Sequence, residues 1–302
     1  MNKLTIGSRG SKLALLQSKQ VRDMLLKVHP HLDIHINVIQ TQGDKNLDKP
    51  LYEIGGKSIF TAELEDALLN HHIDLAVHSL KDLPSTMEDS FLYIGSPKRE
   101  DARDVFVSNK WETLAEVPSS GTIATGSVRR KAQLLHQNPD LHILGLRGNI
   151  DTRLRKLDES KWDGIITAAA ALHRLGLQNR IAQYLDPEHF VPAGGQGALG
   201  LETVVDREDV KQIVSSMIDK NTTKCCQAER LYLTQMEGDC FAPIGCWARM
   251  ENAVLHITGY SSSLDGSRYL IKTVQGNIVE ADKLALKLTD TMIQHGAKEL
   301  MN

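Results

Sequence analysis

The feature that most constrains the fold is a repeated alternation of short apolar segments with amphipathic ones. The first apolar run spans residues 4–7, and the segment after it has apolar residues at helical spacing, among them Leu13, Leu16 and Val21. Further strands are predicted at 35–39, 73–77, 105–107, 122–124, 142–144 and 164–167. Helices are predicted between most of them. This alternation is typical of α/β proteins, so most neighbouring strands should form parallel or mixed sheets.

Glycine and proline interrupt the alternation at two places, residues 96–101 and 192–197. We interpret these as two crossings of the chain between two lobes. After about residue 222 the order changes to a helix over 222–235, a turn that contains a cysteine, strands over 254–258 and 269–274, and a final helix. This order predicts a small α+β region at the end of the chain.

Length and charge narrow the classes of function. The 302 residues with 41% hydrophobic content suffice for the cores of two or three domains. The net charge of -3 gives no general surface for polyanions, so any anion site must be local. The sequence has no apolar run suited to a signal peptide or a membrane span, so we expect a cytoplasmic protein with no membrane partner.

The four cysteines all lie in the last third of the chain, at positions 225, 226, 240 and 246. This distribution argues against a disulfide framework, and the spacing does not supply a zinc site, so no metal is expected. Cys240 stands in a turn of glycine, acid and proline over residues 237–245. A thiol there can react, or can anchor a prosthetic group through a thioether. The alternative is a small buried apolar side chain.

The first of four polar loops, residues 7–12, leads from a predicted strand into a helix. Helix N-terminal amides, two serines and two cations meet there, which suits a carboxylate or a phosphate. Ser8 or Ser11 could instead simply cap the helix. Arg9 has no such structural explanation.

The second loop, residues 78–84, follows the apolar strand over 73–77. It places Lys81 and Asp82 at the end of a buried strand, where open α/β sheets bind ligands. A carboxylate there can accept N–H hydrogen bonds from a heterocycle and stabilise a developing cation. A surface ion pair or a turn is the alternative. We expect His78 to hydrogen-bond the backbone.

The third and fourth loops, residues 125–131 and 146–153, direct up to four arginines to one region. The planar guanidinium group suits carboxylates, so the pattern favours a small ligand with several carboxylates over a nucleotide. Signatures of phosphate-binding and dinucleotide-binding loops are absent. Solvation of a helix face is the alternative for Arg130, Lys131, Arg155 and Lys156.

Six segments in a fixed order carry a resemblance to a known family. They are Ile6-Gly7-Ser8-Arg9-x-Ser11-x-Leu13-Ala14, Gly55-Gly56-Lys57, His78-Ser79-x-Lys81-Asp82-x-Pro84, Leu146-Arg147-Gly148-Asn149-x-x-Thr152-Arg153, Pro192-Ala193-x-Gly195-Gln196-Gly197 and Glu237-Gly238-x-Cys240. Through them the chain resembles the hydroxymethylbilane synthases, also called porphobilinogen deaminases, from residue 4 to at least residue 245.

The resemblance implies an α/β fold with two periplasmic-binding-protein-like lobes, each on a mixed five-stranded sheet, plus a small α+β C-terminal domain. The implied boundaries are 1–98 with 198–217 for domain 1, 103–192 for domain 2, and 220–302 for domain 3. It also implies a monomeric transferase of haem biosynthesis, with a dipyrromethane cofactor linked to Cys240 by a thioether. Four porphobilinogen molecules would be deaminated and joined to this cofactor, and hydrolysis would release hydroxymethylbilane.

The resemblance assigns residue roles, which agree with the need of acetate and propionate groups for cationic partners. Catalytic roles fall on Asp82, Lys81 and Arg9, with Asp82 stabilising the azafulvenium cation left when ammonia departs. Cofactor-binding roles fall on Cys240, Asp82, Lys57, Ser79, Lys81, Thr125, Ser127, Arg129, Arg130 and Gly148. Substrate-binding roles fall on Arg9, Ser11, Arg147, Arg153, Arg174 and Gln196. The resemblance thus returns Arg130 to the site.

Two positions depart from the family pattern: Gly126 stands where serine is frequent, and Ser58 where glycine is common. One hydroxyl contact to the cofactor is therefore not assured.

A two-lobed carboxylate-binding or regulatory protein is the competing class, and the presence of Asp82 and Cys240 argues against it. RNA binding through the basic segments is opposed by the negative net charge and by the lack of an aromatic stacking motif, so no nucleic acid is expected.

Overall fold

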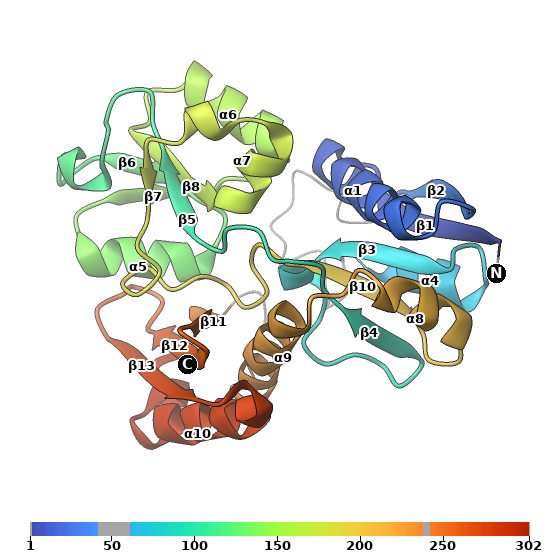
Figure 1. The fold of residues 1–302 in the computed structure, drawn as a ribbon. Coiled ribbons are helices and arrows are strands. Elements are labelled where there is room, and N and C mark those ends of the chain that lie inside the picture. Colours follow the sequence, from blue (N-terminus) through green and yellow to red (C-terminus); the bar gives the residue numbers. More distant parts are fainter. Residues whose placement is uncertain (1, 42–60, 238–241, 302) are drawn as a thin grey trace. The chain divides into compact units, whose positions relative to one another are not determined.

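The computed structural model describes residues 2–41, 61–237 and 242–301. The predicted site residues Lys57 and Cys240 therefore lie outside the described residues, as does Ser58. The chain divides into two compact units, Met1–Glu100 with Ala198–Thr223, and Asp101–Gly197 with Lys224–Asn302. Figure 1 labels the elements of each unit.

The first unit is built on a mixed sheet of five strands in the order β2-β1-β3-β10-β4. β1 runs parallel to β2 and β3, whereas β10 is antiparallel to β3 and β4. The elements of this unit are β1 (Lys3–Arg9), α1 (Lys12–Val28), β2 (Asp33–Ile39), α4 (Ala62–Leu69), β3 (Leu75–Ser79), a 3-10 turn (Leu80–Asp82), β4 (Phe91–Gly95), β10 (Leu199–Val204) and α8 (Glu208–Ser215). A strand from residues 199–204 thus completes a sheet begun by the first hundred residues.

Both faces of this sheet are covered by apolar side chains. On one face, Val21 of α1 and Val210 of α8 share a core with Leu75. On the other face, Leu64 of α4 packs in a core with Ala76. Because β3 is buried on both sides, its first three residues are apolar, and polar residues begin at its C-terminal end with His78.

The second unit contains another mixed sheet of five strands, in the order β7-β6-β8-β5-β9. β6 is parallel to β7 and β8, and β5 is antiparallel to β8 and β9. Its elements are β5 (Asp104–Val107), a 3-10 turn (Leu114–Glu116), β6 (Thr122–Ala124), α5 (Val128–Gln137), β7 (His142–Leu144), α6 (Ile150–Glu159), β8 (Gly164–Ala168), α7 (Ala169–Leu175), a 3-10 turn (Gln178–Arg180) and β9 (Gln183–Tyr184).

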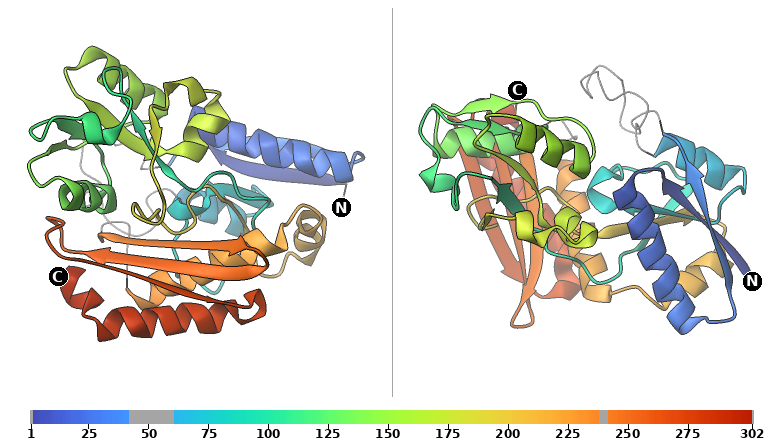
Figure 2. Two further views of the ribbon diagram at one scale, coloured as in Figure 1. Left: turned by 60° about the vertical axis from the view of Figure 1, so that its left-hand side comes forward. Right: turned by 90° about the horizontal axis from the view of Figure 1, so that it is seen from above.

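A three-stranded antiparallel sheet, β11-β12-β13, forms the C-terminal part of the second unit. The elements of this part are α9 (Lys220–Gln235), β11 (Ile244–Glu251), β12 (Val254–Ser262), β13 (Tyr269–Gly276), a 3-10 turn (Ile278–Glu280), α10 (Ala281–Gln294) and α11 (Ala297–Met301). The first four residues of α9 fall in the first unit. The left view of Figure 2 shows α10 running along one face of the sheet. Tyr232 of α9 is fully buried in the same core as Leu288 of α10. A side chain at Gly259 would lie 2.9 Å from the Tyr232 ring, so glycine permits this close packing.

The predicted fold class is confirmed: the chain is α/β, with two mixed five-stranded sheets and a small C-terminal sheet packed with helices. Strands β4, β9, β10 and β11 were not predicted. β11 begins at residue 244, inside the segment 237–245 that had been assigned to the cysteine turn, and residues 199–204 follow a glycine-rich segment that obscures the start of a strand. Within residues 2–41, 61–237 and 242–301, no helix combines the length and the apolar character needed to cross a membrane.

Candidate active site

In the first unit, strand ends that are distant in sequence line one small cavity of about 60 Å³. Arg9 is the last residue of β1, Ser79 is the last residue of β3, and Asp82 ends the 3-10 turn that follows β3. Ser11, at the start of α1, lines the same cavity. The structure therefore brings four predicted site residues together at the C-terminal ends of two parallel strands, the edge where open α/β sheets bind ligands.

Hydrogen bonds from α1 hold this arrangement. The Gln17 side chain, 2% exposed, donates through Nε2 to the Ser79 hydroxyl at 2.8 Å. The Ser11 hydroxyl accepts a hydrogen bond from the Ala14 amide at 3.2 Å, so Ser11 caps the helix as one alternative predicted. Lys81 lies in the 3-10 turn between Ser79 and Asp82.

The expectation that His78 hydrogen-bonds the backbone is wrong. Its Nε2 lies 2.8 Å from Oε2 of Glu202 on β10, and both side chains are buried. Gly200 is the register partner of His78, which places Glu202 two residues along the same face of the sheet. A buried carboxylate needs a polar partner, and His78 supplies one for Glu202. The pair joins β10 to β3 just before the polar loop.

In the second unit, the loop between β6 and α5 is held by its own hydroxyl groups. Ser127 caps α5 by accepting a hydrogen bond from the Arg130 amide at 3.4 Å, and Thr125 Oγ1 accepts from the Ser127 amide at 3.3 Å. A Cβ atom at Gly126 would lie only 2.5 Å from the carbonyl oxygen of Leu146. The glycine that departs from the family pattern is therefore required by the close approach of two of the predicted loops.

The loop between β7 and α6 contains Gly148 with a φ of +108°, in the region that favours glycine. The Arg153 side chain donates through Nε to the Gly148 carbonyl at 2.7 Å. Arg147 is half-buried in the same loop. Arg174 of α7 donates through Nη2 to the Gly197 carbonyl at 2.7 Å. Of these predicted substrate-binding arginines, Arg153 and Arg174 are thus held against backbone carbonyl groups.

Arg129 and Arg130 do not lie on a solvated helix face, because both are buried and both meet Asp104. Arg130 donates through Nε and Nη2 to Oδ1 of Asp104 at 2.9 and 2.7 Å. Nη2 of Arg129 lies 2.8 Å from Oδ2. The alternative that Arg130 lies on a solvated helix face is therefore wrong. The same alternative holds for Lys131, Arg155 and Lys156, which are exposed.

Electrostatics of this cluster favour anions. Burial alone would raise the pKa of Asp104, but the charges of Arg129 and Arg130 and hydrogen bonds from Arg130 and Gln196 lower it to about 2. Burial is also the main reason that the pKa of Arg129 lies below its ordinary value. Two guanidinium groups against one carboxylate leave a surplus of one positive charge, and a ligand carboxylate would neutralise it.

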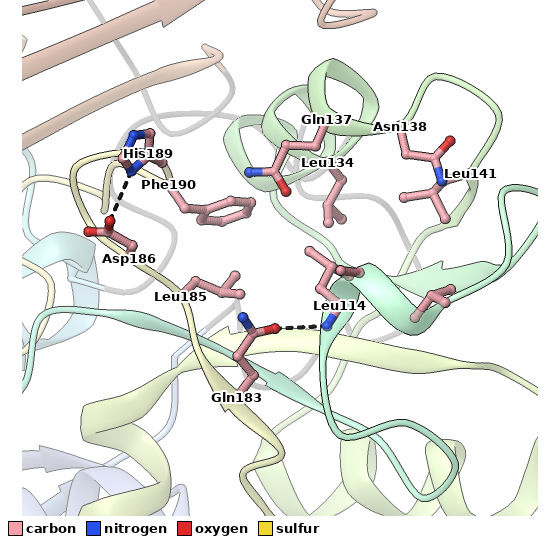
Figure 3. A pocket seen from close by; sticks show the side chains of 12 residues that line it. Leu114, Leu134, Gln137, Asn138, Leu141, Gln183, Leu185, Asp186, His189 and Phe190 are labelled. Carbon is pink, nitrogen blue, oxygen red and sulfur yellow. Dashed lines mark hydrogen bonds and ion pairs between the residues drawn. The ribbon is translucent and has the colours of Figure 1, made fainter.

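A larger pocket in the second unit, about 420 Å³ in volume, contains none of the predicted site residues. Figure 3 shows its lining by Leu134, Leu185 and Phe190, which belong to a core of this unit. Several of its polar groups bond to one another or to backbone, as in the 2.9 Å pair of His189 with Asp186 and the 2.7 Å hydrogen bond from the Leu114 amide to Gln183. We do not assign this pocket to the site.

Three residues that support the site were not predicted: Asp104, Glu202 and Gln17. Asp104 opens a strand that is otherwise apolar, and Glu202 interrupts another. A charged residue within an apolar strand requires a buried partner, and that signal could have identified both. Gln17 lies on a helix with other polar residues and carries no such signal.

Comparisons with known proteins decide the family. Residues 4–212 match the family model described as "Porphobilinogen deaminase, dipyromethane cofactor binding domain", and residues 223–294 match "Porphobilinogen deaminase, C-terminal domain". The chain belongs to the porphobilinogen deaminase family. The resemblance found in the sequence is thereby confirmed, and with it membership of a family of transferases that carry a dipyrromethane cofactor.

Relatives match over nearly their whole length. The porphobilinogen deaminase of Syntrophobacter fumaroxidans is 42% identical over 99% of this chain and 96% of its own length. The porphobilinogen deaminase of Staphylococcus carnosus is 43% identical over 100% of this chain and 98% of its own length. Among solved structures, the methionine-binding protein MetQ covers 72% of this chain with 90% of its own length, at 14% identity and a TM-score of 0.48.

Proposed function

We propose that this chain deaminates four porphobilinogen molecules, joins them to a covalent dipyrromethane primer and releases hydroxymethylbilane by hydrolysis. The observation that carries the proposal is the cavity of the first unit at which Arg9, Ser79 and Asp82 meet, in a chain of the porphobilinogen deaminase family. A carboxylate and a guanidinium group at one cavity suit a heterocycle that forms a cation and bears carboxylates of its own.

Asp82 is the proposed catalytic carboxylate. When porphobilinogen loses ammonia, positive charge develops beside the pyrrole ring, and an ionised carboxylate lowers the free energy of that state. The carboxylate oxygens can also accept the pyrrole N–H. Arg9 and Lys81 are proposed to neutralise the carboxylates of the reacting units, which orients the rings for bond formation.

The proposed cofactor is a dipyrromethane linked to Cys240 by a thioether. When bound, the dipyrromethane supplies the pyrrole α-carbon to which the first substrate unit is joined. Its acetate and propionate groups fit the surplus positive charge of the buried Arg129 and Arg130. The proposed cofactor-binding residues are Cys240 as the thioether anchor, Asp82, Lys57, Ser79, Lys81, Thr125, Ser127, Arg129, Arg130 and Gly148. The proposed substrate-binding residues are Arg9, Ser11, Arg147, Arg153, Arg174 and Gln196.

We also propose that the chain works as a cytoplasmic monomer of three domains, over 1–98 with 198–217, 103–192 and 220–302. Two separate mixed sheets and one antiparallel sheet support this division. The net charge of -3 supports a small-molecule substrate rather than a nucleic acid.

The test is to incubate the purified full-length chain with porphobilinogen and to measure ammonia and linear tetrapyrrole together. We expect four ammonia molecules for each hydroxymethylbilane released. Binding of porphobilinogen without release of ammonia would contradict the proposal and would favour the competing class, a two-lobed carboxylate-binding protein.

A further inference from the structure

The buried carboxylate of Asp104 lies at the centre of a cluster in the second unit. Asp104 is the first residue of β5 and is fully buried. Its Oδ1 accepts hydrogen bonds from Nε and Nη2 of Arg130, and a third from Nε2 of Gln196 at 2.9 Å. Its Oδ2 faces Arg129 at 2.8 Å. One side chain therefore sets the position of two guanidinium groups and of an amide.

The same guanidinium groups are fixed from other sides by backbone. Arg129 donates through Nη1 to the Val191 carbonyl at 2.6 Å, and Nη1 of Arg130 lies 3.4 Å from the Ile166 carbonyl. Gln196 donates through Nε2 to the Ala102 carbonyl at 2.8 Å as well. Contacts from several directions leave these side chains little rotational freedom, which is how a binding group is held ready for its ligand.

The charges in this cluster do not balance. In the part of the chain that the structure describes, Asp104 is the one carboxylate paired with Arg129 and Arg130. Both arginines are at most 5% exposed, so water screens their mutual repulsion poorly. A second carboxylate would relieve that repulsion, whereas loss of Asp104 would leave two buried cations side by side.

The cluster also adjoins the strand that follows the cysteine turn. A Cβ atom at Gly245 of β11 would lie 3.2 Å from Cδ of Arg129 and 2.8 Å from the Pro192 carbonyl. The Cys246 amide donates to the same carbonyl at 3.1 Å. Arg129 therefore packs directly against the segment that continues from Cys240, which is the proposed anchor.

From these contacts we infer that Asp104 is a positioning residue, which holds Arg129 and Arg130 in the orientation that binds one carboxylate of the dipyrromethane. This inference rests on the proposed function. Asp104 itself would not contact the cofactor, since Oδ1 accepts hydrogen bonds from Arg130 and Gln196 and Oδ2 forms an ion pair with Arg129. The alternative is an ion pair that only stabilises the fold.

The test compares two full-length variants, Asp104→Asn and Asp163→Asn. Asp163 is a matched control because it directly precedes β8 of the same sheet. It accepts hydrogen bonds from the amide of Thr122, the first residue of β6, at 2.8 Å and from Nε1 of Trp111 at 3.0 Å. Each protein is incubated with porphobilinogen, its intact mass is measured under denaturing conditions, and its melting temperature is recorded.

We expect Asp104→Asn to lower the fraction of chains that carry two linked pyrroles about tenfold, as loss of a group that orients ligand-binding residues commonly does. Asp163→Asn should lower the melting temperature but keep the wild-type fraction. Equal fractions in Asp104→Asn and wild type would overturn the inference, as would equal losses in both variants. A wild-type chain that never acquires the adduct would instead contradict the proposed function.

A second variant keeps the test decisive if Asp104→Asn does not fold. Asp104→Glu preserves the negative charge but displaces the carboxylate by one methylene group, so we expect a folded protein that gains the adduct several-fold more slowly. A wild-type rate in Asp104→Glu would show that charge alone matters and would overturn the positioning role.

Discussion

The side-chain amide of Gln17 donates a hydrogen bond of 2.8 Å to the hydroxyl of Ser79 and so joins helix α1 to the end of strand β3. The bond is partly shielded from water, because Gln17 is buried and Ser79 is half-buried. Ser79 precedes the 3-10 turn that ends at Asp82, so the helix helps to fix the strand end that leads to the proposed catalytic carboxylate.

Replacement of Gln17 by alanine should therefore weaken both stability and turnover. Loss of a buried hydrogen bond costs about 1–2 kcal/mol of unfolding free energy, and we expect turnover to fall several-fold. Urea unfolding and a porphobilinogen assay measure the two effects. Gln20→Ala, at an exposed position of the same helix, is the matched control and should resemble wild type. An unchanged turnover in Gln17→Ala would contradict the role given to the helix.

Asp82→Asn should preserve folding and the covalent pyrroles while turnover falls by about 100-fold or more, because a neutral amide cannot stabilise the developing cation. Single-turnover measurement of ammonia release checks the chemical step directly. The exposed Asp89 of the same unit supplies the control variant Asp89→Asn, which should retain activity. Turnover of Asp82→Asn within a few-fold of wild type would refute the catalytic assignment.

The ion pairs of Asp104 should make stability depend on acid pH. Its pKa in the folded protein is about 2, below the ordinary value of 3.8, so the stabilisation is fully present above pH 4. It is lost as the pH falls toward 2, and amounts to roughly 2 kcal/mol. The difference in unfolding free energy between wild type and Asp104→Asn should shrink over this window. A difference that stays constant from pH 6 to pH 2.5 would contradict the shift.

Gly126→Ser, which restores the residue frequent in the family, should harm this chain. Its Cβ would lie 2.5 Å from the Leu146 carbonyl, so the loop must move, at a cost of about 1–3 kcal/mol. Gly145→Ser is the matched control in the neighbouring loop, where no atom lies within 4 Å of the added Cβ. Thermal unfolding of both variants measures the cost. Equal melting temperatures would mean that the loops can separate freely.

The fold and the site could be predicted from the sequence where neighbouring residues carry the signal. The apolar run over 73–77 predicts a buried strand, and the polar residues directly after it include Asp82, so both the strand and its place at the site could be predicted. The errors at His78 and Arg130 have another origin. Their partners, Glu202 and Asp104, are 124 and 26 residues away, and helical or strand spacing carries no information about such pairs.

The most direct test of the proposed function is the intact mass of the purified chain under denaturing conditions, before and after incubation with porphobilinogen. We predict an excess over the mass of the 302 residues that equals two linked pyrrole units, located on the peptide that contains Cys240. Cys240→Ser should carry no adduct, and Cys225→Ser should keep it. An unmodified wild-type mass after incubation, or an adduct that persists in Cys240→Ser, would contradict the account.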